Sequence, residues 1–423
     1  MRETQTEVLV VGAGPVGLFA ALELHQSGVE VTVIERDSRT AARSYACALH
    51  PHTLSRLKTL GLLEDVLKLS RRVDKVAFYD GNSRQGELNL AALPSEFPFL
   101  LVLPQSAFES VLATKLRQTG VALHWSHRFV EAMEETHEVV STVEELAGTS
   151  TGYIVPHWET TVKERMALRS QFLLGTDGFH STVRQSLHID NQTLGEPEVF
   201  AAFEFETDDP VADEVRVVLD DSTTNVLWPL PDRKYRWTFQ LLRSEFPESF
   251  PEKERRAVRL LQPEMDERIR QYVQTVAGRR APWFSAAIKD VTWCSEVRFQ
   301  RRMASSFGHG RSWLAGDAAH QTGPVGVQSM NAGFAEVEML AQLISRIQKQ
   351  KASLEIMGTY EKAQNIRWHH LLGKSGALKN RAQTNTWAAK RAGRLLSCLP
   401  GLDSDLSALA TQLGLDWLDN EAK

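Results

Sequence analysis

The sequence predicts an α/β fold that opens with a parallel βαβ unit, continues into a mainly antiparallel sheet and ends in helices. Three observations support this prediction. A β-branched run at 7–12 (EVLVVG) precedes a helical pattern at 15–28 and a second strand-like run at 30–36 (EVTVIER), an order typical of parallel strands joined by a covering helix. Strand-like runs between 199 and 242 then follow one another without helices. The chain after 329 has mostly helical periodicity.

The composition is that of an ordinary globular protein. Domains usually have about 100–200 residues, so 423 residues predict two or three of them. The net charge of -5 provides no basic field for nucleic acid. The apolar stretch 8–24 has no positively charged segment before it and is interrupted by Pro15, so we expect neither a signal peptide nor an integral membrane segment. The odd, widely spaced cysteines (Cys47, Cys294, Cys398) indicate free thiols, no metal site and a cytoplasmic protein.

The remaining elements follow in order. The pattern predicts a helix over 51–69 that is broken near Gly61, short strands over 73–103, a helix over 106–119 and a strand over 121–125. Several strands with polar turns are expected over 129–175, and an antiparallel sheet rich in aromatic residues over 199–242. The charged run 252–277 is predicted to be a helix with a solvated face, and strands are predicted over 291–303 and 312–316.

The motif GAGPVG follows the first strand and opens the first helix, which is the context of a dinucleotide fingerprint in a Rossmann-like unit. Gly12 permits the tight turn, Gly14 permits approach of a pyrophosphate, and Gly17 permits close packing of helix and strand. The helix N-terminus offers free N–H groups to an anion. Glu35 ends the second strand, where an acid accepts hydrogen bonds from an adenosine ribose. The motif alone does not separate FAD from NAD.

Two further motifs follow buried strands. LLGTDGFHSTVR at 173–184 places Asp177 and Gly178 at a strand end, although a turn with a capping serine would give the same pattern. WLAGDAAH at 313–320 places Asp317 directly after a strand, where a carboxylate is costly without partners and sugar hydroxyls would be suitable ones. An aspartate cap before a core helix is the alternative for that motif.

The three motifs, in this order, resemble the single-component FAD-dependent aromatic hydroxylases, the group A flavoprotein monooxygenases with the p-hydroxybenzoate hydroxylase fold. The resemblance covers roughly residues 5–345. It implies a discontinuous FAD-binding domain, a substrate-binding domain and a C-terminal helical region. The expected boundaries are 1–73, 101–190 and 286–345 for the first domain, 74–100 and 191–285 for the second, and 346–423 for the helical region.

The resemblance also implies roles for individual residues. Glu35 would bind the adenosine ribose, Arg43 a phosphate of FAD, and Asp317 the ribityl chain. Pro324 would lie near flavin and substrate, and the peptide N–H groups of Met330 and Asn331 would face the flavin pyrimidine edge. The full set expected to bind the cofactor is Gly12, Gly14, Pro15, Val16, Gly17, Glu35, Arg36, Arg43, Gln105, Asp177, Gly178, Gly316, Asp317, Pro324, Ser329, Met330 and Asn331.

The sequence departs from the family pattern after the third motif. The family has GGQGMNxG followed by an Asp, whereas this chain has GVQSMNAG followed by Glu336. Val327 and Ser329 therefore replace two glycines at the expected flavin contact. Side chains are tolerated there only if φ stays negative or the flavin ring shifts, and the sequence leaves both alternatives open.

The implied reaction is hydroxylation of a small, phenol-like aromatic substrate through a flavin C4a-hydroperoxide, with NAD(P)H as a transient co-substrate and O2 as oxidant. No second GxGxxG is present to hold the nicotinamide cofactor permanently. The aromatic sheet at 199–242 is expected to supply a dry enclosure. No catalytic residue is assigned; His50, His52, Tyr79 and Tyr235 are candidates by type only, and a packing or surface role is the more ordinary one. The chain would be a monomer or a homodimer.

Other functions fit parts of the pattern. A Baeyer–Villiger oxygenase, an epoxidase or a reductase could use the same scaffold, and a non-catalytic FAD-binding protein would fit the altered glycines. An NAD-dependent dehydrogenase would explain GAGPVG and Glu35 and leave the later motifs unexplained. A flavin halogenase is disfavoured because WPLP at 228–231 does not match the WxWxIP motif of those enzymes.

Overall fold

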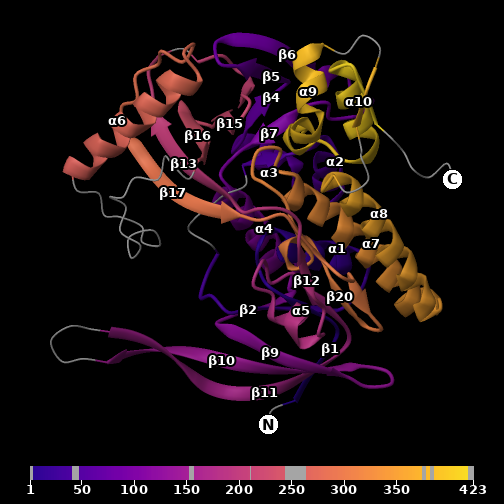
Figure 1. The fold of residues 1–423 in the computed structure, drawn as a ribbon. Coiled ribbons are helices and arrows are strands. Elements are labelled where there is room, and N and C mark those ends of the chain that lie inside the picture. Colours follow the sequence, from indigo (N-terminus) through magenta and orange to yellow (C-terminus); the bar gives the residue numbers. More distant parts are fainter. Residues whose placement is uncertain are drawn as a thin grey trace.

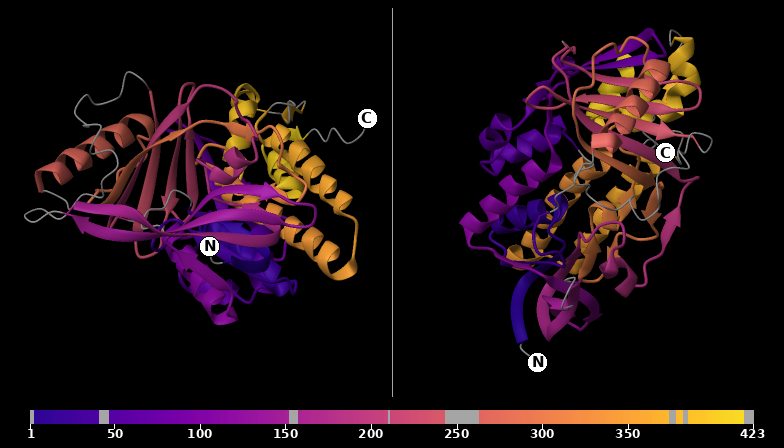
Figure 2. Two further views of the ribbon diagram at one scale, coloured as in Figure 1. Left: turned by 90° about the horizontal axis from the view of Figure 1, so that it is seen from below. Right: turned by 90° about the vertical axis from the view of Figure 1, so that its left-hand side faces the viewer.

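The computed structural model describes residues 3–40, 47–151, 157–209, 211–242, 263–373, 378–381 and 385–417. Arg43 lies outside these residues. Two large sheets form the body of the molecule, and the C-terminal helices lie beside both of them (Figures 1 and 2).

The first sheet contains the predicted parallel βαβ unit. Its strand order is β19 (Gly308–His309), β20 (Ser312–Leu314), β11 (His157–Gly175), β1 (Glu3–Val11), β2 (Val31–Glu35) and β8 (Ala122–Trp125). The pairs β20–β11, β11–β1, β1–β2 and β2–β8 are all parallel. The earlier part of β11, residues 157–170, pairs antiparallel with β10 (Val139–Thr151). Strand β10 in turn pairs antiparallel with β9 (His127–Glu134). Strands β10 and β11 continue as a ribbon beyond the body (Figure 1).

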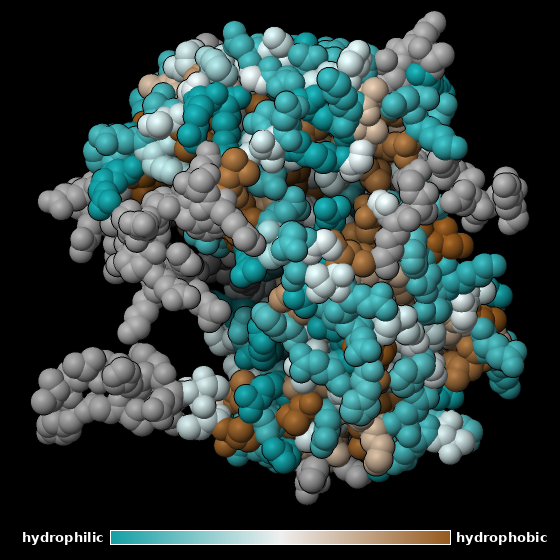
Figure 3. Space-filling model, viewed as in Figure 1, coloured by the Kyte–Doolittle hydropathy of each residue, from teal (hydrophilic) through white to brown (hydrophobic). Residues whose placement is uncertain are grey.

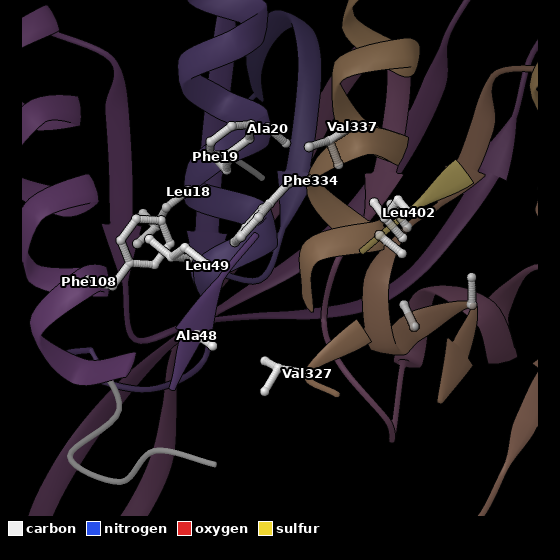
Figure 4. Packing of buried hydrophobic residues seen from close by; sticks show 14 of the residues in the cluster. Leu18, Phe19, Ala20, Ala48, Leu49, Phe108, Val327, Phe334, Val337 and Leu402 are labelled. Carbon is white, nitrogen blue, oxygen red and sulfur yellow. The ribbon is translucent and has the colours of Figure 1, made fainter. Parts of the chain in front are cut away.

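Helices α1 (Pro15–Gln26), α4 (Gln105–Thr119) and α7 (Gln328–Gln350) pack together against this sheet. Every residue of α1 from Gly17 to Leu24 is buried, so this helix is a core element rather than an amphipathic one. Phe334 of α7 packs on Phe19 of α1 and on Phe108 of α4, with ring centroids 4.7 Å and 5.8 Å apart (Figure 4). The predicted break near Gly61 separates α2 (Pro51–Thr59) from α3 (Leu63–Lys68).

The second sheet is mainly antiparallel, as predicted. Its order is β17 (Val291–Phe299), β13 (Glu198–Glu206), β16 (Lys234–Leu241), β15 (Thr224–Pro229), β14 (Val215–Leu219), β5 (Lys75–Asp80) and β6 (Ser83–Asn89). Only β14 and β5 pair in parallel. In Figure 2 this sheet stands between α6 (Pro263–Arg280) and the rest of the molecule.

The two faces of the second sheet differ in a way that the sequence pattern did not reveal. Phe203, Phe205 and Trp237 form one core with α6, on the face turned away from the first sheet, while Trp228 belongs to the large core shared with that sheet. The expectation that the aromatic residues of 199–242 enclose the reaction is therefore wrong for those three. Alternate residues of a strand face opposite sides of the sheet. The sequence does not show which of these two sides α6 covers.

Smaller elements complete the fold. Two three-stranded sheets contain β3 (Ala48–Leu49), β7 (Leu100–Val102) and β4 (Arg71–Val73), and β12 (Asn191–Thr193), β18 (Arg302–Ala304) and β21 (His320–Gln321). The other elements are α5 (Thr182–Ser186), η1 (Leu90–Ala92), η3 (Gly316–Ala318), η4 (Leu354–Met357), α8 (Gly358–Leu371), β22 (Leu378–Asn380), α9 (Thr386–Leu395), η5 (Leu396–Cys398), α10 (Asp403–Gln412) and β23 (Leu415–Trp417). No helix among the described residues combines the length and apolar character needed to cross a membrane. The face shown in Figure 3 is mainly hydrophilic.

Candidate functional site

The three sequence motifs meet at one edge of the first sheet. Strands β20, β11, β1 and β2 are neighbours and run parallel, so their carboxyl ends lie together. The backbone links these ends directly: Gly12 N–H donates to the Ile34 carbonyl at 2.8 Å, and Thr176 N–H donates to the Val11 carbonyl at 2.9 Å. The crevice outside the carboxyl ends of parallel strands is where α/β proteins bind their ligands.

The glycine turn fits a ligand that approaches the backbone. At Gly12, φ is +104°, and an added Cβ would lie 2.5 Å from the Thr176 carbonyl oxygen. At Gly17 a Cβ would lie 1.9 Å from the Gly12 carbonyl oxygen, so the protein itself requires both glycines. Gly14 differs, because its φ is -71° and a Cβ there would meet no atom within 4 Å. Gly14 therefore borders open space directly before α1, whose N-terminus has no side-chain cap.

Glu35 closes the turn from the neighbouring strand. Its Oε2 accepts a hydrogen bond from Ala13 N–H at 2.7 Å, and its Oε1 accepts one from Asp37 N–H at 2.9 Å. Each carboxylate oxygen keeps a further lone pair for a ligand hydroxyl. The first part of the cleft lies here and has a volume of about 270 Å³. The residues that line it and were expected to bind the cofactor are Gly12, Gly14, Pro15, Glu35, Arg36, Gln105, Asp177 and Gly178.

The second motif combines both interpretations offered for it. The Asp177 carboxylate accepts hydrogen bonds from Ser181 Oγ at 2.6 Å and from Thr182 N–H at 2.7 Å, while Ser181 Oγ caps α5 by accepting from Arg184 N–H at 2.9 Å. Burial raises the pKa of Asp177 despite these hydrogen bonds. The capping turn thus exists, and the same turn places Asp177 and Gly178 in the cleft.

The third motif forms the second part of the cleft, of about 420 Å³. Val16, Asp317, Pro324, Ser329 and Met330 line it. Solvent reaches the Asp317 carboxyl through the cleft, yet the surrounding protein raises its pKa; the charge of His320 opposes this and that of Glu336 adds to it. The two parts share Gly14, Pro15, Gln105, Thr176 and Gly178, so the cleft is continuous from Glu35 to Met330.

Three predicted residues pack behind the cleft rather than lining it. Gly17 supports the turn, as described above. Gly316 packs on Val16, where an added Cβ would lie 3.1 Å from Val16 Cγ2. The Asn331 side chain makes four hydrogen bonds: its Oδ1 accepts from His50 N–H and Thr53 Oγ, and its Nδ2 donates to the Ala48 and Val327 carbonyls. Its role is to fix the start of α7 against β3 and α2.

A buried charged cluster behind the third motif was not predicted. Glu336 is fully buried and accepts hydrogen bonds from Gly316 N–H at 2.8 Å and Trp368 Nε1 at 2.7 Å. His320 Nε2 lies 2.7 Å from Glu336 Oε1, and the His320 ring stacks on Trp368 with centroids 3.5 Å apart. Burial alone would raise the pKa of Glu336, but His320 and these hydrogen bonds hold it below the ordinary value. Two carboxylates lie in the apolar run AGFAEVEMLAQLI, and the spacing of Glu336, four residues from both Ala332 and Leu340, is the sequence signal that could have revealed it.

The loop before α7 contains strained backbone. Val327 has φ +52° and ψ +37°, so the first of the two alternatives, negative φ, does not hold at this position. A β-branched residue in the left-handed region is an outlier that the surrounding structure must enforce. Ser329 lies inside α7 and spans the loop, because its Oγ accepts a hydrogen bond from Thr322 N–H at 3.0 Å.

Residues distant in sequence enforce this strained loop. His50 Nε2 lies 2.9 Å from the Gly326 carbonyl, and Gln328 Nε2 donates to the Leu396 and Leu399 carbonyls at 2.8 Å and 3.1 Å. Burial lowers the pKa of His50 to about 3, so the ring is neutral and donates to the carbonyl. The segment around Leu396 and Leu399 therefore helps to fix the loop that lines the cleft. The sequence did not predict this contribution.

The other residues considered by type lie away from the cleft. His52 is half-exposed and pairs with Glu338 on α7 at 3.0 Å. Tyr79 and Tyr235 are buried in the second sheet and pack with aromatic partners of its α6 face.

Comparison with known proteins agrees with this geometry. A family described as "FAD binding domain" matches residues 5–372. The chain belongs to this FAD-binding family. Para-nitrophenol 4-monooxygenase of Pseudomonas sp. (strain WBC-3) is 29% identical over 378 residues, which are 85% of this chain and 82% of that protein. 6-Methylpretetramide 4-monooxygenase of Streptomyces rimosus is 29% identical over 358 residues, which are 84% of this chain and 58% of that protein.

The fold of this FAD-binding protein also matches solved structures. The crystal structure of p-nitrophenol 4-monooxygenase from Pseudomonas putida DLL-E4 superposes with a TM-score of 0.72 at 23% identity, covering 97% of this chain and 94% of that one. The fold is thus that of the group A flavin hydroxylases. The chain is an FAD-dependent monooxygenase, and the dehydrogenase interpretation is wrong.

Proposed function

We propose that FAD lies along the cleft from Glu35 to Met330 and that the enzyme uses NAD(P)H and O2 to hydroxylate a phenol-like ring. The open space at Gly14 is the main support for this placement of FAD, because a pyrophosphate is the group that an uncapped helix N-terminus beside such a space accepts best. Two relatives support the substrate class: one is named for para-nitrophenol, and a pentachlorophenol 4-monooxygenase of Sphingobium chlorophenolicum is 24% identical over 368 residues.

Each part of the cleft suits one part of the cofactor. The lone pairs of Glu35 would accept hydrogen bonds from the adenosine ribose, and Asp317 would accept them from the ribityl hydroxyls. Hydroxyl donors favour the ionised form of Asp317 and so oppose the surrounding protein, which raises its pKa. Arg36 and Gln105 line the first part of the cleft and would contact the nucleotide.

The start of α7 would face the electron-rich edge of the flavin ring. Gln328, Ser329 and Met330 form the first turn, whose N–H groups have no acceptor within a helix. The Asn331 N–H faces the Val327 carbonyl one turn earlier, so Met330 is the better donor of the two that were predicted. These N–H groups and the helix dipole stabilise negative charge at the ring edge. Bound FAD supplies the two-electron chemistry that links NAD(P)H to O2.

The test begins with the cofactor. Purified protein should show a flavin spectrum, and Asp317→Asn should weaken FAD binding, whereas Asp65→Asn on the surface of α3 should not. Substituted phenols should then stimulate NAD(P)H oxidation and yield product that contains one atom from 18O2. Protein that neither contains FAD nor takes it up would refute the proposal. FAD without oxygenated product would point instead to a non-catalytic FAD-binding protein.

We also propose a cytoplasmic location and a monomeric or homodimeric state. The cysteines support the location, because Cys47 and Cys398 are buried thiols and no disulfide joins any of the three cysteines. Fractionation and light scattering would test the two statements.

A further inference from the structure

A buried ion pair on the second sheet has no part in the placement of FAD. Phe203 and Phe205 of β13 face α6, so Glu204 between them points to the opposite face, which is turned towards the first sheet. Arg236 of β16 is the register partner of Glu204, so its side chain lies on the same face. The two form an ion pair in which 2% of the Arg236 side chain and 16% of the Glu204 side chain are exposed. Solvent therefore reaches the pair mainly at the carboxylate.

The geometry of this pair leaves one carboxylate oxygen available. Arg236 Nε donates a hydrogen bond to Glu204 Oε1 at 3.0 Å, and Arg236 Nη2 donates to the same oxygen. Among the described residues, no group forms a hydrogen bond with Glu204 Oε2. A carboxylate oxygen accepts hydrogen bonds through two lone pairs, so Oε2 can accept one from a ligand. A buried ion pair often adds no stability over apolar residues of the same volume, so stability alone does not account for this one.

The ion pair lies opposite the segment that holds the start of α7. Burial raises the pKa of the Cys47 thiol to about 12, and the charges of the ion pair also act on it, so this thiol lies beside the pair. The next residue, Ala48, accepts a hydrogen bond from Asn331 Nδ2 at 3.0 Å, and the same nitrogen donates to the Val327 carbonyl at 2.8 Å (Figure 4). Val327 lines the second part of the cleft. The ion pair is therefore close to the end of the cleft where the flavin ring and the substrate are expected.

We propose that Glu204 selects the substrate: its Oε2 accepts a hydrogen bond from the hydroxyl group of an uncharged phenol, and its negative charge excludes phenols that carry a carboxylate. This inference rests on the proposed function and narrows its substrate class. An arginine that served a substrate carboxylate would present its planar fork of donors to it. Here Glu204 occupies Nε and Nη2 of Arg236. Arg236 is therefore a positioning residue that fixes the carboxylate of Glu204.

Binding of two phenols to the FAD-loaded protein tests the proposal without turnover. 4-Methylphenol and 4-hydroxybenzoate are matched probes, because both have a phenol hydroxyl and a small group opposite to it, and they differ in charge. Each probe is titrated into the holoenzyme, and the change in the flavin absorbance spectrum gives its dissociation constant. 4-Methylphenol should bind at least about tenfold more tightly than 4-hydroxybenzoate, because a second negative charge beside Glu204 is unfavourable.

Substitution of the glutamate should reverse this preference. Glu204→Gln keeps an acceptor for Arg236 but removes the negative charge, so it should weaken binding of 4-methylphenol and strengthen binding of 4-hydroxybenzoate by about tenfold. A damaged fold would not produce a gain in affinity for one probe. Glu206→Gln is the control, because Glu206 lies at the end of the same strand and pairs with Lys234 at 3.7 Å. It removes the same charge and should leave both affinities unchanged.

The outcomes separate the role of Glu204 from the function on which it rests. Equal affinity of the wild-type holoenzyme for the two probes, tighter binding of 4-hydroxybenzoate, or binding of neither probe overturns the role of Glu204 while FAD binding stands. An unchanged preference in Glu204→Gln overturns it as well. Protein without FAD contradicts the proposed function itself. If Glu204→Gln does not fold, Glu204→Asp decides, because it keeps the charge and withdraws the oxygen: it should lose affinity for 4-methylphenol and still exclude 4-hydroxybenzoate, and unchanged affinity for 4-methylphenol would overturn the proposal.

Discussion

The left-handed backbone at Val327 leads to a prediction about stability, and the neighbouring Val325 provides a matched control for it. Val325 and Val327 are both in the loop before α7 and are equally buried, with 4% and 5% of their surface exposed. Only Val327 has positive φ. We therefore compare Val327→Gly with Val325→Gly, two substitutions that remove the same side chain from the same loop.

The difference between the two variants isolates the backbone strain. Each substitution removes a buried side chain that stabilises the fold by about 1.5–3 kcal/mol and adds a backbone entropy cost of about 0.5–1 kcal/mol. At Val327 the substitution also relieves left-handed strain of about 1–2 kcal/mol. Val325→Gly should therefore lower the free energy of unfolding by about 2–4 kcal/mol, and Val327→Gly should lower it by about 1–2 kcal/mol less.

Urea unfolding of the FAD-saturated protein, followed by both circular dichroism and tryptophan fluorescence, measures this difference. The FAD dissociation constant of each variant is measured separately, because cofactor binding adds to apparent stability. Equal losses in the two variants would show that the left-handed conformation of Val327 costs nothing and would contradict this prediction.

Three further predictions concern the cleft. Ser329→Gly should keep FAD bound but release more hydrogen peroxide per NAD(P)H oxidised, because the Ser329–Thr322 link across the loop is lost; an unchanged ratio would deny the serine a special role. Glu336→Gln should cost about 1–3 kcal/mol of stability and weaken FAD binding, because Gly316 N–H and Trp368 Nε1 donate to different oxygens of Glu336 and the amide leaves one of these buried donors without an acceptor; exposed Glu355→Gln is the control, and similar losses in both would contradict this. Asp317 has a raised pKa, so its native form holds the proton more tightly than the unfolded chain does. Its ionisation then destabilises the apoprotein as pH rises above about 3.8, and Asp317→Asn should stabilise the apoprotein at pH 7 and have no advantage at pH 3, as urea midpoints across that range would show.

The parts of the site that the sequence predicted are those with local causes. A glycine turn between a strand and a helix, or an aspartate at a strand end, depends on residues close in the chain. The parallel order of the strands then brings these turns together, and this is why Glu35, Asp177 and Asp317 line one continuous cleft. The predicted domain division and the roles of these residues toward FAD stay predictions.

The features that the sequence did not predict depend on distant contacts. No local signal marks Val327 as left-handed, since valine disfavours that conformation. His50 and Gln328 enforce it through partners 276 and 68 residues away. In the same way, β16 is buried on both faces, so its residue pattern does not reveal that Trp237 faces α6 rather than the cleft.

The dependence of Gln328 on the Leu396 and Leu399 carbonyls has a consequence for the life of the protein in the cell. Chains fold from the N-terminus as they are synthesised, so the glycine turn and its strands are complete long before the loop before α7 receives its last partners. The adenosine half of the cleft is thus ready early, whereas the ring half waits until residue 399 has been made. On the proposed function, a prematurely terminated chain holds no correctly seated flavin, and oxygen chemistry is confined to molecules whose translation has passed that point.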